Sequence, residues 1–362
     1  MLRYAEFLLT ELTLRGYKVR LVTPPVVLGR LLRPNHRWSK WFAYLDKYLI
    51  FRLTLPWQIR QADLVHVCDH SNATYLPWIK RAQRLITCHD ALAILSARGV
   101  FPENKTRMTG RKLQNWILRS LRSADRIVYV SEKTHEDFEQ ALSINTPYVV
   151  IPHALHWAYE HVSEASVDAA LRSYGIQCNQ YLLHVGSNVW YKNRLGVLKA
   201  YAAIVHESRY ANLRLVMAGA EFSQELESYI REHNLEQIVS VVCPTNEQLR
   251  CLYSGALAFL FPSLQEGFGW PLLEAQACGC PVITSNRAPM TEVTAGSSVD
   301  YDPERPEAAV AALDELVAHR EKYIALGEQN IKRFSAEAMM REYEAVYWSL
   351  AESSGGSQPK TN

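Results

Sequence analysis

Two glutamates eight positions apart, Glu266 and Glu274, bracket a turn that contains Gly267, Gly269 and Pro271. An apolar run before the turn predicts a buried strand, and Pro271 suits the first turn of a helix. A helix N-terminus at a strand end attracts anions, because its N–H groups and its dipole are positive there. The glycines would let a phosphate approach the backbone, and the carboxylates could accept hydrogen bonds from sugar hydroxyls. The stretch therefore predicts a site for a phosphorylated ligand with sugar hydroxyls, although taken alone Glu274 is better explained as a helix-dipole partner and Glu266 as a solvated loop residue.

A second group of residues, HVGSNVWYKN at 184–193, ends a predicted strand at Gly186 and places Lys192 six positions later. The ammonium of Lys192 could neutralise a diphosphate, because it carries a full positive charge and three N–H donors. A lysine in a loop is more often simply solvated, so this interpretation needs support from its surroundings.

Two pairs of neighbouring His and Asp residues follow predicted strands in the first half of the chain. They are Asp69 with His70, and His89 with Asp90. Both pairs are expected to face one cleft, because the carboxyl ends of parallel strands meet at the same edge of a sheet. Such a histidine is often only a hydrogen-bonded loop residue, and no motif supplies the nucleophile of a Ser-His-Asp triad.

These residues depend on short apolar runs that alternate with helical patterns, which predicts an α/β fold built on parallel sheets. The expected strands lie at 18–24, 62–69, 84–90, 124–131, 148–152, 181–187, 213–219, 238–244, 256–263 and 281–286. The expected helices lie at 4–15, 114–122, 132–142, 196–207, 221–233, 247–253 and 271–278. Two doubly wound domains that face each other across a cleft account for both series.

The stretch FPSLQEGFGWPLLEAQACGCPVITSN, in which seven residues separate Glu266 from Glu274, resembles the signature of the family 4 glycosyltransferases. These are retaining enzymes of the GT-B fold. The resemblance implies that Glu274 binds the ribose of a nucleotide sugar and that Glu266 binds a hydroxyl of the transferred sugar. It also implies that the amides of Phe268 and Gly269 contact the sugar or the diphosphate.

The loop after Gly186 is similar to the diphosphate-binding loop of the same family, with Lys192 as its cation. Members often carry an arginine directly after the glycine or directly before the lysine, where this chain has Ser187 and Tyr191. Arg194 lies near but outside that pattern. We place Gly186, Ser187 and Lys192 on the donor side.

In the first domain, His89 resembles the family's histidine that contacts the donor sugar across the cleft. Asp90, Asp69 and His70 are weaker candidates on the acceptor side. Glu292 is expected to be structural, since a glutamate at a helix start is commonly a cap.

The domain boundaries follow from Pro152 and from the irregular residues after it. We predict an acceptor-side N-terminal domain at 1–152, a linker at 153–175 and a C-terminal nucleotide-sugar-binding domain at 176–335. The last two expected segments are a helix that crosses back to the N-terminal domain at 336–352 and a flexible tail at 353–362. Family members usually begin with a strand and a glycine-rich loop, and the N-terminal domain here is expected to lack both.

The 362 residues carry a net charge of +2, seven cysteines and no run long enough to span a bilayer. We expect a cytoplasmic protein with reduced thiols and no nucleic-acid partner. We also expect no metal site, because the sequence contains neither a cluster of metal ligands nor a P-loop. The segment 30–60 mixes Arg and Lys with Trp, Phe and Tyr. It predicts either a peripheral contact with the inner face of the membrane or a helical hairpin whose aromatic side chains pack on the domain.

The resemblance implies a retaining transfer of a hexose-type sugar, and the lack of a metal-ligand cluster in the sequence predicts that the transfer needs no metal ion. The donor would be a nucleoside-diphosphate sugar, with no separate cofactor, and the acceptor a hydroxyl of a glycan or of a lipid-linked molecule. Two alternatives stay open at this point. One is a weak or inactive sugar-nucleotide or glycan-binding protein, and the other is a sugar-phosphate epimerase or phosphorylase of the same fold.

Overall fold

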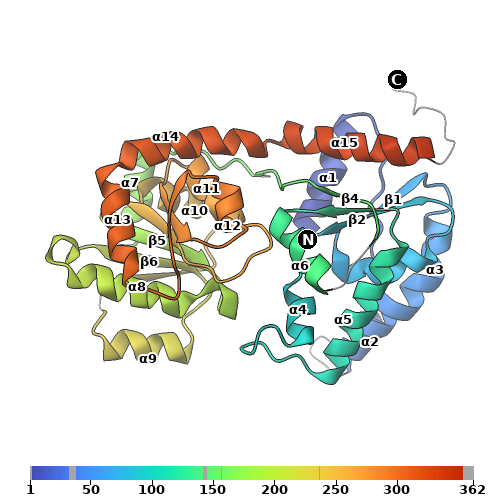
Figure 1. Cartoon of the computed structure of the whole chain (residues 1–362), viewed down its shortest axis with the longest axis horizontal. Helices are drawn as coiled ribbons and strands as arrows, with labels where there is room; N and C mark the ends of the chain where they lie inside the picture. The colour runs from blue at the N-terminus through green and yellow to red at the C-terminus, as the bar shows by residue number, and fades with distance from the viewer. Residues whose placement is uncertain (1, 32–37, 142–144, 156, 236, 354–362) are drawn as a thin grey trace.

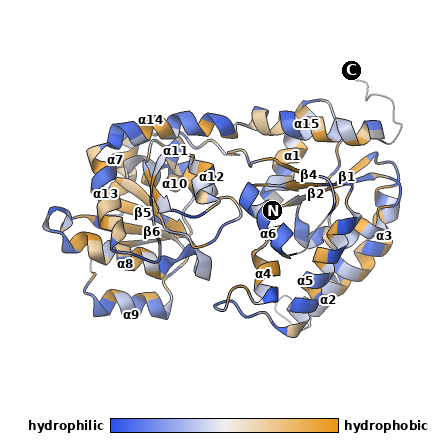
Figure 2. Cartoon of the chain, in the orientation of Figure 1, coloured by the Kyte–Doolittle hydropathy of each residue, from blue (hydrophilic) through white to orange (hydrophobic). Residues whose placement is uncertain are grey.

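The computed structural model describes residues 2–31, 38–141, 145–155, 157–235 and 237–353. In these residues the chain forms two α/β domains placed side by side, and two helices, α14 (Arg320–Asn330) and α15 (Ala336–Ser353), follow each other along the top of the view from one domain to the other (Figure 1). The strands are mostly hydrophobic, whereas the helices that cover them alternate between hydrophobic and hydrophilic residues (Figure 2).

The N-terminal domain is built on a four-stranded parallel sheet with strand order β1-β2-β3-β4. Its strands are β1 (Leu64–Val67), β2 (Gln83–Cys88), β3 (Arg126–Tyr129) and β4 (Tyr148–Val150). Its helices are α1 (Leu2–Leu14), α2 (Ser39–Leu45), α3 (Phe51–Gln58), α4 (Leu92–Arg98), α5 (Met108–Ser120) and α6 (Glu132–Ala141).

The C-terminal domain is built on a six-stranded parallel sheet with strand order β10-β9-β8-β5-β6-β7. Its strands are β5 (Tyr181–Gly186), β6 (Arg214–Gly219), β7 (Ile238–Val242), β8 (Ala258–Phe261), β9 (Val282–Ser285) and β10 (Ser298–Tyr301). Its helices are α7 (Glu164–Arg172), α8 (Arg194–His206), α9 (Gln224–Glu232), α10 (Asn246–Gly255), α11 (Trp270–Ala277), α12 (Met290–Thr294), α13 (Ala308–Ala318) and α14 (Arg320–Asn330). The strand order changes direction between β5 and β8, which is where open α/β sheets bind ligands.

Nine of the ten predicted strands are confirmed, from β1 to β9. The strand predicted at 18–24 is wrong. That segment has no regular structure, and its apolar side chains Val19 and Leu21 are exposed, because no strand of the described residues lies beside it to complete a ladder. The first described element is α1, and the absence of an earlier strand and glycine loop stays a prediction.

The segment predicted as a linker, residues 153–175, contains α7. The buried side chains Val167 and Leu171 of this helix lie in the same core cluster as Tyr253 of α10. The predicted linker thus includes a helix of the C-terminal domain. Of the predicted tail at 353–362, all but its first residue lies outside the described residues.

Helix α15 (Ala336–Ser353) returns to the N-terminal domain and packs beside α1 (Figure 1). Its buried Met340 and Tyr343 share a core cluster with Tyr4 and Leu8 of α1 and with Leu85 of β2. This contact places an end of the chain on the first sheet, so the two domains are joined by α15 as well as by the segment after β4.

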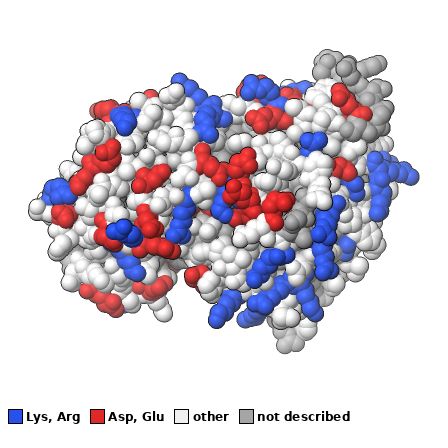
Figure 3. All heavy atoms as spheres, in the orientation of Figure 1, with Lys and Arg blue, Asp and Glu red and all other residues white. Residues whose placement is uncertain are grey.

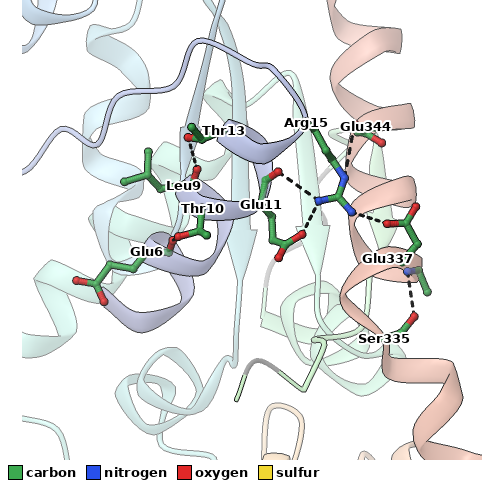
Figure 4. Close-up of polar contacts among 10 residues, drawn as sticks. Glu6, Leu9, Thr10, Glu11, Thr13, Arg15, Ser335, Glu337 and Glu344 are labelled. Atoms are coloured by element: carbon green, nitrogen blue, oxygen red, sulfur yellow. Dashed lines mark hydrogen bonds and ion pairs between the residues drawn. The ribbon is translucent and has the colours of Figure 1, made fainter. Parts of the chain in front are cut away.

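Arg15, just after α1, adds polar contacts to this helix pair (Figure 4). Its guanidinium donates to the Glu11 carboxylate, and it donates to Glu337 Oε2 of α15 at 2.6 Å. Glu344 Oε1 lies 4.0 Å from Arg15 Nε. Partly exposed ion pairs of this kind contribute only about 0–1 kcal/mol each, so the apolar contacts carry most of the stability of the pairing.

Candidate active site

The two charged residues predicted for the donor side meet at the carboxyl ends of β5 and β8. Lys192 follows β5 and Glu266 follows β8, and these strands are neighbours in the sheet. Lys192 Nζ donates to Glu266 Oε1 at 2.7 Å, and Ser263 Oγ donates to the same oxygen at 2.9 Å. The sequence had placed Lys192 and Glu266 at strand ends, and the structure brings them into direct contact.

The loops that carry this pair are fastened to each other by backbone and side-chain hydrogen bonds. Leu264 N donates to Tyr191 O at 2.8 Å, and Asn193 Nδ2 donates to Pro262 O at 3.0 Å. Asn193 adopts the left-handed conformation, with φ 53°, and its side chain caps α8 by accepting from Gly196 N at 3.2 Å. Asparagine tolerates this conformation better than most residues, so the same residue can end the loop that carries Lys192 and cap the start of α8.

Gly186 and Ser187 lie at the start of the same loop, where β5 approaches β6. Ser187 is exposed. Arg194 is buried and does not take the place of the arginine expected near Ser187, because its guanidinium donates to Asn188 Oδ1 and to Glu221 O instead. Arg194 therefore braces the loops that follow β5 and β6.

Glu274 lies on the first turns of α11, partly buried behind the turn. Its Oε2 accepts a hydrogen bond from the hydroxyl of the buried Tyr253 at 3.0 Å. Burial raises the pKa of Glu274 to about 7, while the bond from Tyr253 opposes that rise. Near neutral pH this carboxyl is thus divided between its charged and neutral forms.

Because Glu274 would accept hydrogen bonds from ribose hydroxyls as a carboxylate, donor affinity is expected to rise with pH through about 7. We expect binding about tenfold weaker at pH 6 than at pH 8. Stability should change in the opposite sense. The carboxyl of Glu274 has an ordinary pKa of 4.5 in the unfolded chain and a pKa of about 7 in the folded protein, so between these pH values only the folded state keeps the proton. The contribution of Glu274 to the free energy of unfolding therefore falls as the pH rises from 4.5 to about 7.

Calorimetric titration of a donor analogue and thermal unfolding, each across this pH range, check both effects. Glu274→Gln is the control, because it keeps the shape and removes the titration. An affinity that varies with pH to the same extent in wild type and in Glu274→Gln would contradict the assignment.

The turn between the two glutamates is held against the N-terminal domain. Gly267 O accepts hydrogen bonds from Ser131 Oγ at 2.7 Å and from Thr134 Oγ1 at 2.9 Å. A Cβ atom added at Gly267 would lie 1.8 Å from His89 O, so only glycine permits this approach. Gly269, with φ 114°, forms the N-cap of α11 and turns the chain into the helix.

His89 lies at this domain interface, but both its ring nitrogens have protein partners. Nε2 is 2.8 Å from Cys68 O, which can only accept, so Nε2 carries the proton. Nδ1 then accepts from His153 Nε2 at 2.9 Å. Burial lowers the pKa of His89 to about 4, which favours this neutral form. A contact between His89 and a donor sugar stays a prediction and would require one of these bonds to be exchanged.

His153 links His89 to the turn and was not predicted as a site residue. It is buried, stacks on Trp270 at 4.3 Å between ring centroids, and meets Phe268 edge to face at 5.2 Å. The Phe268 side chain is thereby fixed in the interface, and the donor contact of its amide stays a prediction.

The weaker candidates of the first domain have local structural roles. Asp69 Oδ1 accepts from Ser71 N at 2.8 Å, and Asp90 Oδ1 accepts from Leu92 N at 3.0 Å, so both cap the turns that follow their strands. His70 is buried, with its ring edge to face against a phenylalanine of α6.

Glu292 of α12 caps a helix of the other domain. Its two carboxylate oxygens accept from Glu132 N and Lys133 N, each at 3.0 Å, at the start of α6. A carboxylate suits this position because the N–H groups there have no partner within the helix. The structural role predicted for Glu292 thus crosses the domain interface.

No group of three or more His, Cys, Asp and Glu residues within the described ranges is arranged to hold a metal ion. Positive charge at the site comes from Lys192, from the N-terminal end of α11 and from Arg3 of α1, whose charge acts on the Glu274 carboxyl.

This fold and this site define a two-domain glycosyltransferase of the GT-B class. Two family models match the chain: Glycosyltransferase Family 4 over residues 1–156 and Glycosyl transferases group 1 over residues 172–333. The chain belongs to the family 4 glycosyltransferases, so the resemblance inferred from the paired glutamates is confirmed.

Curated relatives agree with this assignment. O-antigen chain mannosyltransferase B of Escherichia coli is 28% identical over 301 residues, which cover 79% of this chain and 76% of that protein. N-acetyl-alpha-D-glucosaminyl L-malate synthase of Bacillus anthracis is 26% identical over 249 residues, covering 66% of this chain and 63% of that protein. These relatives support glycosyl transfer in general.

Solved structures show the same fold. WaaG, a glycosyltransferase involved in lipopolysaccharide biosynthesis, superposes with a TM-score of 0.67 at 18% identity, covering 98% of this chain and 95% of that one. HepE of Anabaena, in complex with UDP and glucose, has a TM-score of 0.70 at 15% identity, covering 84% and 83%. The predicted GT-B architecture is therefore confirmed.

Proposed function

We propose that the protein transfers a hexose from a nucleoside-diphosphate sugar to a hydroxyl of a glycan or of a lipid-linked acceptor, with retention of the anomeric configuration and without a metal ion. The observation that carries the proposal is the cluster at the carboxyl ends of β5 and β8. There Lys192, Glu266 and the start of α11 combine a cation, a carboxylate and a helix N-terminus in one place.

Each part has a chemical role in this proposal. Glu274 binds the ribose hydroxyls, and Glu266 binds a hydroxyl of the sugar. Lys192, together with the Phe268 and Gly269 amides, stabilises the diphosphate as its negative charge grows. Lys192 has three N–H donors and gives one to Glu266, so it can contact a phosphate without leaving the carboxylate.

The transfer step needs no protein nucleophile in this scheme. The acceptor oxygen forms a bond to the anomeric carbon on the face from which the diphosphate departs. The bond between that carbon and the phosphate oxygen breaks, and the acceptor proton moves to the departing phosphate. The buried interface around Gly267 and His89 favours this chemistry, because excluding water strengthens electrostatic interactions.

The comparisons support the donor class and the type of sugar. HepE is a structural neighbour in complex with UDP-glucose, and the Escherichia coli relative is named O-antigen chain mannosyltransferase B. The first fits a nucleotide-sugar donor, and the second fits a glycan or lipid-linked acceptor.

A panel of UDP-, GDP- and ADP-sugars, with release of nucleoside diphosphate as the readout, tests the proposal. We expect one nucleotide class to give turnover. Glu274→Ala should lower kcat/KM by about a hundredfold, because the site loses the carboxylate that accepts hydrogen bonds from the ribose hydroxyls. Turnover should persist in a metal chelator. Tight binding of a donor without any transfer to glycan or lipid-linked acceptors would favour a sugar-nucleotide-binding protein instead.

A further inference from the structure

A row of large apolar side chains lies on the outer surface of the N-terminal domain, along α2, a π-helical segment at Asp46–Ile50 and α3. Its members recur every four residues, and we call them the apolar row. They are Trp41, Leu45, Leu49, Leu53 and Trp57, with exposed fractions of 64%, 43%, 54%, 66% and 67%. Large apolar side chains that lie together on a protein surface commonly mark an interaction surface.

The row stays on one side of the helix because of the π-helical segment. In a regular α-helix, residues four apart drift around the axis by about 40° per step. Each π turn takes up an additional residue and reverses that drift. The wide turn at Asp46–Ile50 lies in the middle of the row and so helps to keep its two ends aligned.

The opposite side of the same helix is packed against the domain. Phe51 and Leu55 are 3% and 4% exposed, and Phe51 meets Tyr75 edge to face at 4.9 Å. The guanidinium of Arg52 lies 4.7 Å from the ring centroids of both Trp78 and Trp116. The helix is therefore docked by a second set of residues, and the exposed row is not needed to hold it in place.

The surroundings of the row are cationic. From residue 104 to residue 124 the chain has six Lys and Arg residues and no Asp or Glu. Helix α5 lies in this stretch, and its Trp116 packs on Tyr48 of the π-helical segment. Figure 3 shows Lys and Arg gathered over the region of α2, α3 and α5. The one acidic residue between 12 and 62, Asp46, is buried and accepts hydrogen bonds from three backbone N–H groups.

The N-terminal domain as a whole is also positively charged, whereas the rest of the chain is negatively charged. Residues 1–152 contain 23 Lys and Arg and 12 Asp and Glu, a net charge of +11, whereas residues 153–362 contain 16 and 25, a net charge of −9. An anionic surface would attract the N-terminal domain and orient it, because the two halves have opposite signs.

We propose that the apolar row is a docking surface for an anionic lipid bilayer. Leucines in the middle can enter the acyl boundary, and the tryptophans at both ends suit the headgroup level. The surrounding Lys and Arg residues attract acidic headgroups. A second copy of the chain is disfavoured as the occupant, since two N-terminal domains of charge +11 would face each other.

The attachment is peripheral. In the part of the chain that the structure describes, no helix combines the length and the apolar character needed to cross a membrane. The inference extends the proposed function, because a docked N-terminal domain would meet a lipid-linked acceptor at the bilayer surface. It does not depend on catalysis, since it concerns the unliganded surface alone.

Sedimentation with vesicles, in the absence of donor and acceptor, tests the inference. The 362-residue chain should sediment with phosphatidylcholine vesicles that contain phosphatidylglycerol and much less with phosphatidylcholine alone. The double variant Leu49→Glu and Leu53→Glu should have an affinity for the anionic vesicles that is lower by about tenfold or more. Both side chains are exposed, so circular dichroism should remain that of the wild type.

The matched control is Val317→Glu, which places the same charge at an exposed apolar position of α13 in the other domain. It should bind like the wild type, while Trp57→Ala should show an intermediate loss. Equal binding by the double variant and the wild type, or no binding of the wild type to anionic vesicles, would overturn the inference. A change from dimer to monomer in the double variant would instead assign the row to self-association. Loss of sugar transfer with intact vesicle binding would count against the proposed function alone.

Discussion

Lys192→Ala is expected to lower kcat by about 10²–10³-fold, because it removes the only lysine or arginine in contact with Glu266 among the described residues. The charge of a departing nucleoside diphosphate grows in the transition state, so a cation beside it stabilises that state more than the ground state. Release of nucleoside diphosphate at saturating donor measures the effect. Lys192→Arg should retain part of the activity, since it keeps the charge but changes the geometry.

Two controls separate this role from a structural one. Lys199→Ala removes an exposed cation of α8 and should leave kcat unchanged. Glu266→Gln in the Lys192→Ala background tests whether the loss comes from an unpaired, buried Glu266 carboxylate. If the double variant regained most of the activity, or if Lys192→Ala alone cost less than about fivefold, the assignment of Lys192 to the diphosphate would be wrong.

The fold was largely predictable because each buried strand is a short apolar run between loops. The strand missed by prediction, β10, has the sequence SVDY, in which Ser298 and Asp300 weaken the apolar signal, and pairing with β9 supplies what its composition does not. The strand wrongly predicted at 18–24 shows the converse. An apolar pattern produces a strand only where a neighbour can complete the ladder.

The placement of Lys192 and Glu266 at one edge of the C-terminal sheet was also predictable, because each residue follows a strand and the two strands are neighbours. The contacts between the domains were not. Ser131, Thr134 and Glu292 carry no local signal beyond that of helix starts, and their partners lie in the other domain. Likewise the pairing of His89 with His153 depends on how the segment after β4 passes between the domains.

These contacts mean that the N-terminal domain positions the turn of the C-terminal domain directly. Gly267 is the point of closest approach. Its carbonyl accepts from two hydroxyls of the other domain, and its Cα lies beside the backbone of His89. Glu292 holds the start of α6 on the adjoining side. The position of the turn between Glu266 and Glu274 therefore depends on the arrangement of both domains.

Gly267→Ala is expected to lower kcat/KM by about a hundredfold or more while both domains remain folded. The new methyl group would lie 1.8 Å from His89 O and 2.8 Å from Asp90 Cβ, and the first of these atoms is backbone and cannot turn aside. The φ of Gly267 is not positive, so the loss would come from the collision and not from backbone strain. The domains must move apart, which displaces the turn from Ser131 and Thr134.

Small-angle scattering should show a larger radius of gyration for Gly267→Ala, with an unchanged circular dichroism spectrum. Gly110→Ala is the matched control, because its added methyl group would meet only the end of the Thr106 side chain, within the N-terminal domain. It should keep full activity. Removing the two hydroxyls with Ser131→Ala and Thr134→Val should have a smaller effect than Gly267→Ala, since it loosens the contact without forcing the domains apart. Wild-type activity in Gly267→Ala would show that transfer takes place in a different, more open arrangement of the two domains.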